Sequence, residues 1–222
     1  MKFSKFAHHI VIEDEMIILD ERTDQYLIFD KLQTSEICRN LRSSDASGEE
    51  SPEILELLEK KVLIKPGIQE INKASGKLKV DIHEWTSAFK LEYISSKIRK
   101  PFKTWLTLIL VCLTLKFLGL HRSLNKLRHK KRKNSQPIKK PGRAIEISST
   151  IKHVAKYIPF EVTCLQHALA LFWAGHNEKL ELQLYIGVKN YDFLAHAWIE
   201  ESGVIIGDRP DLSKLLNVIM KI

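Results

Sequence analysis

Two segments near the C-terminus constrain the fold of this chain most, because both carry the two-residue period of a β-strand. Residues 180–189 place an aliphatic side chain at every second position from Leu182, and residues 193–200 alternate in the same way. The next residues, Glu201-Ser202-Gly203, are typical of a three-residue hairpin loop with glycine in the left-handed conformation. The segments therefore predict an antiparallel sheet.

A helix is predicted directly before this sheet, and a cap marks its start. Thr163 and Gln166 have the spacing of a capping box, which places Cys164 at the first helical position. Unpaired backbone N–H groups and the helix dipole favour an anion there, so a thiolate would be stabilised. The alternative is an inert buried thiol, the commoner state of a lone cysteine. Gly175 is expected to end the helix, and its apolar stripe comprises Leu165, Ala168, Leu169 and Phe172.

The expected hairpin register makes His196 face Asp208, with the two side chains about 5 Å apart on one side of the sheet. A carboxylate beside an imidazole fixes its tautomer and supports its protonated form. If the helix of Cys164 packs on that face, the three residues form a Cys–His–Asp constellation suited to nucleophilic catalysis. Less suitable alternatives lie nearby at His167, Asp192 and Asp211.

Residues 1–66 have the pattern of strands followed by helices. A three-stranded antiparallel meander is predicted over residues 7–13, 15–21 and 24–30. A helix follows over 32–41, and a second begins at Pro52 with Ser51 as its N-cap. One face of this second helix carries Ile54, Leu55, Leu58 and Val62. We expect a small winged-helix-like module, and the alternative is a lobe that only packs on the rest of the chain.

The net charge of +8 comes from 35 Lys and Arg against 27 Asp and Glu, and it is unevenly distributed. Residues 97–143 hold 15 basic residues and no acidic residue. Nucleic-acid binding is disfavoured, because the run at 122–133 has no interleaved aromatic residue or base-reading motif. The chain also lacks a glycine-rich phosphate loop. We interpret the basic region as a helical connector, and a non-catalytic protein for nucleic acid or anionic membrane is the alternative.

A membrane helix is weakly indicated at Trp105–Leu120, an apolar run of 16 residues that contains Lys116. A spanning helix needs about 20 apolar residues, so a buried or half-buried helix is favoured over surface association or a true span. No secretory signal is visible at the N-terminus, which predicts a cytoplasmic protein.

Composition and cysteine spacing exclude several other classes of protein. Hydrophobic residues at 44% and charged residues at 28% exclude a wholly disordered chain. Cys38, Cys112 and Cys164 are too few and too far apart for a disulfide scaffold or a zinc module. The histidines lack the spacing of metal ligands, so no metal and no cofactor is expected.

The motifs TCLQHALAL, IGV, AHAWIE and GD occur in this order between residues 163 and 208. Through them, residues 144–222 resemble the transglutaminase-like cysteine peptidase domain of the lasso-peptide biosynthesis B proteins. Residues 1–66 are similar to the fused PqqD-like precursor-recognition domain of that family, in topology and in an Asp-Gln-Tyr strand. The implied organisation is a recognition domain over 1–66, a linker over 67–83 and a peptidase domain over 84–222. Within the last, 84–143 is a basic helical region and 144–222 the catalytic core.

The resemblance implies an α+β protein that acts as a leader peptidase in lasso-peptide maturation. Its C-terminal domain would be transglutaminase- or papain-like, with a nucleophile helix packed on an antiparallel sheet. Cys164 would attack the scissile carbonyl, His196 would serve as general base and then acid, and Asp208 would orient His196. The freed core peptide would pass to an asparagine-synthetase-like cyclase. Acyl transfer to an amine, as in transglutaminases, is the alternative chemistry.

The resemblance also implies that the leader of the precursor adds a strand beside residues 24–29 and packs on the helix from Pro52. The residues expected to line this groove are Tyr26, Leu27, Ile28, Leu55 and Glu59.

Overall fold

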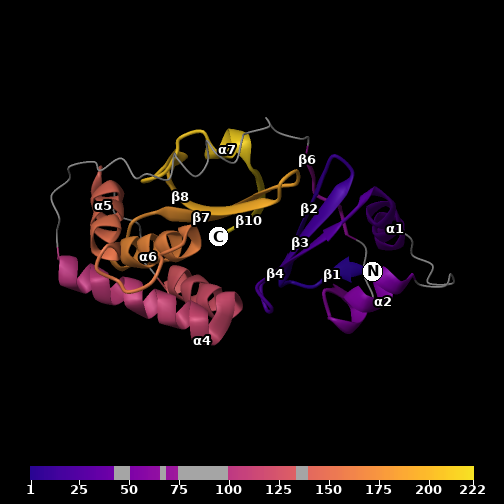
Figure 1. Cartoon of the computed structure of the whole chain (residues 1–222), viewed down its shortest axis with the longest axis horizontal. Helices are drawn as coiled ribbons and strands as arrows, with labels where there is room; N and C mark the ends of the chain where they lie inside the picture. The colour runs from indigo at the N-terminus through magenta and orange to yellow at the C-terminus, as the bar shows by residue number, and fades with distance from the viewer. Residues whose placement is uncertain (43–50, 66–68, 75–99, 134–139) are drawn as a thin grey trace. The chain divides into compact units, whose positions relative to one another are not determined.

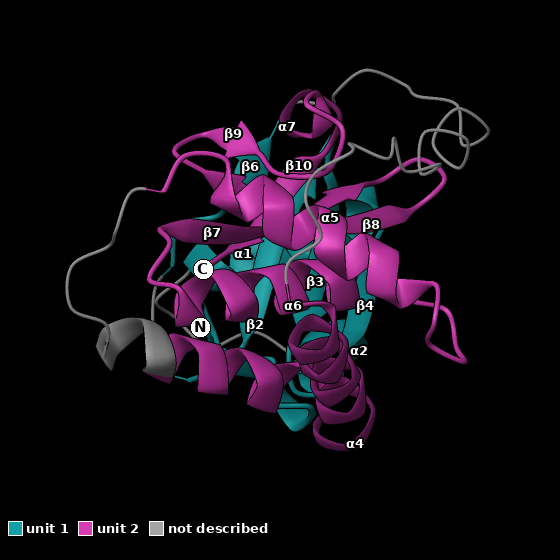
Figure 2. Cartoon of the chain, turned by 90° about the vertical axis from the view of Figure 1, so that its left-hand side faces the viewer, with its two compact units in different colours: residues 1–77 teal, residues 78–222 magenta. Residues whose placement is uncertain are grey.

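The computed structural model describes residues 1–42, 51–65, 69–74, 100–133 and 140–222. The chain divides into two compact units, residues 1–77 and residues 78–222 (Figure 2). The helical pattern expected between Glu84 and Pro101 lies outside the described residues.

Unit 1 contains a four-stranded sheet in the order β4-β3-β2-β6 (Figure 1). The predicted meander is confirmed, because β2, β3 and β4 pair antiparallel in sequence order. β6 pairs parallel to β2, so part of the predicted linker belongs to this sheet. β1 and β5 form a separate antiparallel pair. The elements of unit 1 are β1 (Lys2–Phe3), β2 (Ala7–Ile12), β3 (Glu15–Asp20), β4 (Gln25–Phe29), α1 (Lys31–Arg42), α2 (Pro52–Glu59), β5 (Leu63–Ile64) and β6 (Lys73–Ala74).

The core of unit 1 joins its sheet to both helices. Ile37 and Leu41 of α1 and Ile54 and Leu57 of α2 are buried in one apolar cluster with residues of β2 and β3. The cap prediction for α2 is confirmed, with Ser51 at the N-cap and proline at the start. Within α2, Ile54 and Leu57 are buried, whereas Leu55 is 52% exposed.

Unit 2 places helices on an antiparallel sheet in the order β10-β7-β8-β9. Figure 1 shows α4, α5 and α6 on one side of this sheet and α7 on the other. Trp198 of β8 is buried against the leucines of α7, and α6 packs on β7 and β8. The elements are α4 (Pro101–Lys133), α5 (Arg143–Ala155), α6 (Cys164–Asn177), β7 (Leu182–Lys189), β8 (Leu194–Glu201), β9 (Val204–Ile205), α7 (Leu212–Leu215) and β10 (Asn217–Lys221).

The predicted hairpin after β8 is shorter by one residue than expected. Glu200 pairs with Ile205 and Glu201 with Val204, so only Ser202 and Gly203 form the loop. Both adopt positive φ, +53° and +81°, which is the geometry of a two-residue primed turn. The predicted register, in which His196 faced Asp208, is therefore wrong by one position.

Gly175 lies inside α6, which continues to Asn177, so it does not end the helix as predicted. Gly175 is buried, and a Cβ there would lie 2.3 Å from Cδ1 of Leu182. This glycine therefore permits the close packing of α6 on β7.

α4 is broken at Gly119, where φ is +73°. Its first half has a buried side with Leu108, Val111 and Cys112, in keeping with the favoured half-buried helix. The opposite side carries large exposed apolar side chains, and Phe102 and Phe117 are 75% and 72% exposed. By length and composition alone, Pro101–His129 could cross a membrane. Within the most apolar 18-residue stretch of this helix, 22% is buried inside the protein.

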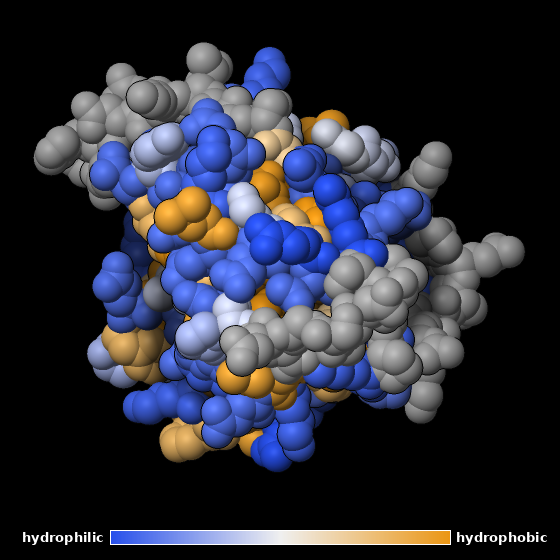
Figure 3. Space-filling view, turned by 90° about the vertical axis from the view of Figure 1, so that its right-hand side faces the viewer, coloured by the Kyte–Doolittle hydropathy of each residue, from blue (hydrophilic) through white to orange (hydrophobic). Residues whose placement is uncertain are grey.

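Apolar side chains also reach the surface elsewhere. The face of the molecule in Figure 3 is largely hydrophilic and carries separate apolar patches. Isolated patches of this kind are normal on a protein surface.

Candidate active site at the start of α6

The start of α6 has the predicted capping box. The backbone N–H of Thr163 donates to Oε1 of Gln166 at 2.8 Å, and the Thr163 side chain caps the backbone in return. Cys164 is the first residue of the helix, as predicted. Its thiol therefore lies where the helix dipole favours negative charge.

His196 and Asp208 form the closest ion pair of the site. Nε2 of His196, on β8, donates to Oδ2 of Asp208 at 2.8 Å. The other carboxylate oxygen, Oδ1, accepts the backbone N–H of Arg209 at 2.8 Å. Both oxygens are therefore held, and the imidazole keeps its other ring nitrogen, Nδ1, for a different partner.

Asp208 reaches His196 by a route that differs from the expected cross-strand pairing. β9 ends at Ile205, and Gly207 then adopts a left-handed φ of +67°. A Cβ at Gly207 would lie 2.0 Å from Oγ of Ser148 on α5. The turn therefore requires glycine both for its conformation and for its contact with α5.

Cys164 meets His196 along the edge of β8. Ile206 donates its N–H to the carbonyl of Ile199, so Ile199 directs its backbone groups toward β9. Alternate residues of a strand direct their backbone groups to the same edge. The N–H of Ala197 therefore also points to the edge of β8 that pairs with β9, at a position that β9 does not reach. This N–H hydrogen-bonds to the sulfur of Cys164, as do the His196 side chain and the N–H of Leu165.

These contacts favour separated charges on cysteine and histidine. Burial opposes ionisation of Cys164, but its hydrogen bonds outweigh burial and lower the pKa of the thiol. Burial likewise disfavours the charged form of His196, yet its bonds to Asp208 and Cys164 raise the pKa of the imidazole to about 9. For Asp208, the hydrogen bond from His196 overcomes burial and lowers the carboxyl pKa. These shifts favour a thiolate–imidazolium pair supported by a carboxylate.

A second layer of side chains lies beside Asp208. His167 of α6 lies 3.4 Å from Oγ of Ser148, and burial lowers its pKa to about 4. Burial also lowers the pKa of Lys152, while the charge of Asp208 opposes that shift. His167 is therefore neutral near pH 7 and differs in charge from His196.

Sequence reasoning identified His167 only as an alternative and did not identify Ser148, Lys152 or Gly207. Ser148 and Lys152 lie four residues apart on one side of α5 and have no motif of their own. The carboxylate alternatives lie elsewhere: Asp192 is exposed in a turn, and Asp211 pairs with Arg209 at 2.7 and 2.9 Å.

The residues expected to bind a leader peptide lie on β4 and α2 of unit 1. β4 is an edge strand of its sheet among the described strands. Ile28 is 49% exposed, and Leu55 and Glu59 are exposed on α2. Tyr26 and Leu27 are half-buried, and Leu27 packs against the core.

No group of three or more His, Cys, Asp or Glu side chains is arranged for a metal ion within the part of the chain that the structure describes.

Comparison with known proteins relates unit 2 to a described superfamily. A family model described as the Transglutaminase-like superfamily matches residues 105–221, slightly more than half of the chain. The microcin J25-processing protein McjB of Escherichia coli is 33% identical over 63 residues. That match covers 28% of this chain and 30% of the relative, so it spans less than a third of either. No solved structure matches.

Proposed function

The chain belongs to the transglutaminase-like superfamily, and on that premise we propose that it is a cysteine peptidase that removes the leader from a lasso-peptide precursor. The hydrogen-bonded series Cys164–His196–Asp208 carries the proposal. The similarity to a protein whose name states that it processes microcin J25 supports a peptide substrate of this kind.

The first step is acylation of the enzyme. The thiolate of Cys164 attacks the carbonyl carbon that joins leader to core, and negative charge develops on the carbonyl oxygen. The first N–H groups of α6 have no acceptor within the helix, so the N–H of Cys164 is the donor we assign to that oxygen. The imidazolium of His196 then gives its proton to the departing amine, which leaves the core with a free N-terminus.

The second step is hydrolysis of the thioester. Neutral His196 takes a proton from water, and the resulting hydroxide attacks the acyl carbon. The leader leaves with a new carboxylate, and the Cys164 thiolate is restored beside a protonated His196. Asp208 keeps its charge throughout and stabilises the imidazolium. An amine in place of water would give acyl transfer, so product analysis with an added primary amine separates the two chemistries.

The exposed groups of β4 and α2 support leader recognition by unit 1. An extended peptide can pair with the edge strand β4 through its backbone, while its side chains contact Ile28 and Leu55. We assign the released core peptide to a cyclase of the asparagine-synthetase type as the next enzyme.

The direct test incubates the protein with candidate precursor peptides, taken from short open reading frames near its gene, and follows leader release by mass spectrometry. Cys164→Ala should abolish release. Cys38→Ala is the matched control, because burial raises the pKa of that thiol and it lies in unit 1, so it should cleave like the wild type. Undiminished cleavage by Cys164→Ala would contradict the proposal.

We also propose that α4 rests on an anionic membrane surface. Its exposed apolar side chains follow one helical stripe at Phe102, Leu106, Leu110, Leu113 and Phe117. Lys103 and Lys116 are exposed beside this stripe, and exposed Arg122 and Lys126 follow it. An apolar stripe flanked by basic side chains suits the interface of an anionic bilayer.

Flotation with vesicles that contain anionic phospholipid tests this localisation. Replacing both Phe102 and Phe117 by Ser should strongly reduce co-flotation. Tyr157→Ser is the control, because Tyr157 is 67% exposed on the loop after α5, away from the stripe. Equal flotation of the double variant and the wild type would exclude the assignment.

A further inference from the structure

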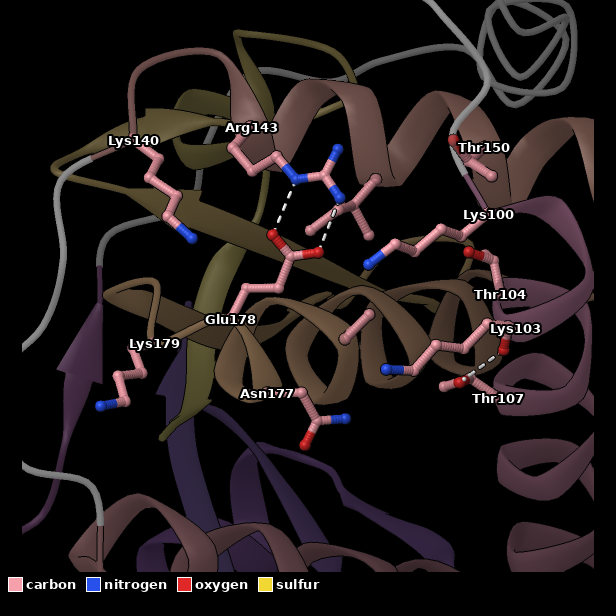
Figure 4. Close-up of a pocket in the computed structure, with 12 residues that line it drawn as sticks. Lys100, Lys103, Thr104, Thr107, Lys140, Arg143, Thr150, Asn177, Glu178 and Lys179 are labelled. Carbon is pink, nitrogen blue, oxygen red and sulfur yellow. Dashed lines mark hydrogen bonds and ion pairs between the residues drawn. The ribbon is translucent and has the colours of Figure 1, made fainter.

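A basic pocket of about 370 Å³ lies in unit 2, where the N-terminal ends of α4 and α5 approach the C-terminal end of α6 (Figure 4). None of Cys164, His196 and Asp208 lines it. Its charged lining comprises five cations and one carboxylate: Lys100, Lys103, Lys140, Arg143, Lys179 and Glu178. We propose that this pocket binds a small anion that carries several phosphate charges.

The arginine of the pocket is already neutralised by protein groups. Nε and Nη2 of Arg143 donate to Glu178 at 2.7 and 2.6 Å, and Nη1 donates to Glu146 at 2.6 Å. These hydrogen bonds raise the pKa of Arg143, and the bond from Arg143 lowers the pKa of Glu178 against the effect of burial. Arg143 is therefore held in place by the two glutamates, which balance its positive charge.

The lysines supply the charge that remains. Figure 4 shows the ammonium groups of Lys100 and Lys140 directed toward the Arg143–Glu178 pair, while that of Lys103 lies on the side of Asn177 and Lys179 points away. Among the described residues, none of these four lysines lies in an ion pair with a carboxylate. Lys100 and Lys140 act on Glu178 only through longer-range attraction, which contributes to its lowered pKa. The pocket thus holds three lysine charges that no described carboxylate neutralises in an ion pair.

Helix polarity makes this arrangement costly without a ligand. Lys100 and Lys103 lie at the start of α4, whose first turn contains no acidic residue. Cations are disfavoured at a helix N-terminus, since the unpaired N–H groups already carry positive charge. α5 also begins at this pocket, after Gly142 with φ of +76°, and no side chain caps it. A bound anion would relieve the lysine repulsion and would also face the start of α5, which no side chain caps.

The size and chemistry of the pocket select a compact polyanion. A volume of about 370 Å³ is roughly twelve times the share of one water molecule in the liquid, so it exceeds the needs of a monatomic ion. Lysine is a usual partner of phosphate as a point charge. Diphosphate or triphosphate brings enough negative charge to meet three ammonium groups within such a space. The triad contributes nothing to this pocket, so the inference does not rest on the proposed function.

Titration of the full chain with sodium triphosphate, followed by calorimetry and by the thermal unfolding midpoint, tests the proposal. Sodium chloride at equal ionic strength serves as the reference, because bulk screening affects all exposed charges. We expect a saturable increase in the unfolding midpoint with triphosphate and none with chloride, since a ligand that binds only the folded state stabilises it.

The decisive variant is Lys100→Gln/Lys103→Gln/Lys140→Gln. It should bind triphosphate about tenfold or more weakly. Without ligand, its unfolding midpoint should equal or exceed that of the wild type, because three repelling charges are gone. Lys179→Gln is the matched control, since it removes a rim charge that points away, and it should bind like the wild type.

Three outcomes would overturn the proposal. The first is a wild-type response to triphosphate no larger than the response to chloride. The second is equal binding by the triple variant. The third is that the lysines are needed for binding to anionic vesicles while triphosphate does not bind. That result would assign the phosphate to a lipid headgroup.

Discussion

Asp208 works on His196 through charge as well as position. An asparagine at 208 retains an oxygen that can accept from Nε2, but it no longer supports the imidazolium. We predict that Asp208→Asn lowers the pKa of His196 and slows leader cleavage by roughly 10²- to 10⁴-fold. Steady-state kinetics with the precursor provide the measurement. Asp211→Asn is the control, because Asp211 pairs with Arg209, and a loss as large in this control would argue against a specific role for Asp208.

The opposed pKa shifts of Cys164 and His196 predict a wide pH range for the ion pair. The pKa of Cys164 is lowered and that of His196 is raised to about 9, so both groups are charged between these values. Alkylation of Cys164 by iodoacetamide should therefore stay fast well below the ordinary thiol pKa of about 8.5. Cleavage should fall above pH about 9, where His196 loses the proton that it gives to the amine.

Mass spectrometry of alkylated peptides at a series of pH values measures this range, with Cys38 as an internal reference. Its pKa is raised by burial, so its alkylation should rise only at high pH. Identical pH dependence for Cys164 and Cys38 would show that no ion pair forms.

The identities of the three triad candidates could be predicted at the scale of residues, but their geometry could not. The expected three-residue loop would have aligned Asp208 with His196 across two strands. Ser202 adopts positive φ, which is uncommon for a residue with a side chain, so the loop is shorter. Gly207 turns the chain after β9 and brings Asp208 to His196 along a different path.

At the scale of elements, the turn at Gly207 couples β9 to α5. Gly207→Ala should destabilise the protein by about 1–3 kcal/mol, because it combines positive φ with a Cβ 2.0 Å from Ser148 Oγ. Gly203→Ala is the matched control: its φ is also positive, but no atom lies within 4 Å of its Cβ. Urea denaturation measures both, and equal losses would show that contact with Ser148 does not matter.

Periodicity predicted most of the helices and strands in the described residues. α6, β7 and β8 follow from apolar spacing and a capping box, and the meander follows from short β-rich segments. The buried face of α2 was not predictable from spacing, because Leu55 and Leu57 are equally apolar and the packing of α1 and the sheet selects Leu57. The break of α4 at Gly119 was missed because its flanking residues keep a helical pattern.

At the scale of the whole molecule, we assign leader recognition to unit 1 and the chemistry to unit 2. We predict that the double substitution of Ile28 and Leu55 by Asp weakens leader binding by about tenfold or more, since both apolar contacts are lost. It should leave alkylation of Cys164 unchanged. Fluorescence anisotropy with a labelled leader peptide provides the measurement.

Val204→Asp is the control for this experiment, because Val204 is exposed and apolar but lies in unit 2. Unchanged leader affinity in the unit 1 variant would remove β4 and α2 as the recognition surface. Loss of Cys164 alkylation in that variant would instead indicate damage that extends to the catalytic unit.

The length of α6 sets a spacing that matters for the substrate. Cys164 is the first residue of α6, whereas Ala174, Asn177 and Glu178, at or near its other end, line the basic pocket. At 1.5 Å per residue this helix is about 21 Å long, roughly the reach of six residues of extended peptide. An anion held by the lysines therefore stays out of reach of the scissile bond. α6 thus separates the two sites. A ligand in the pocket could contact only substrate residues about six positions from the scissile bond.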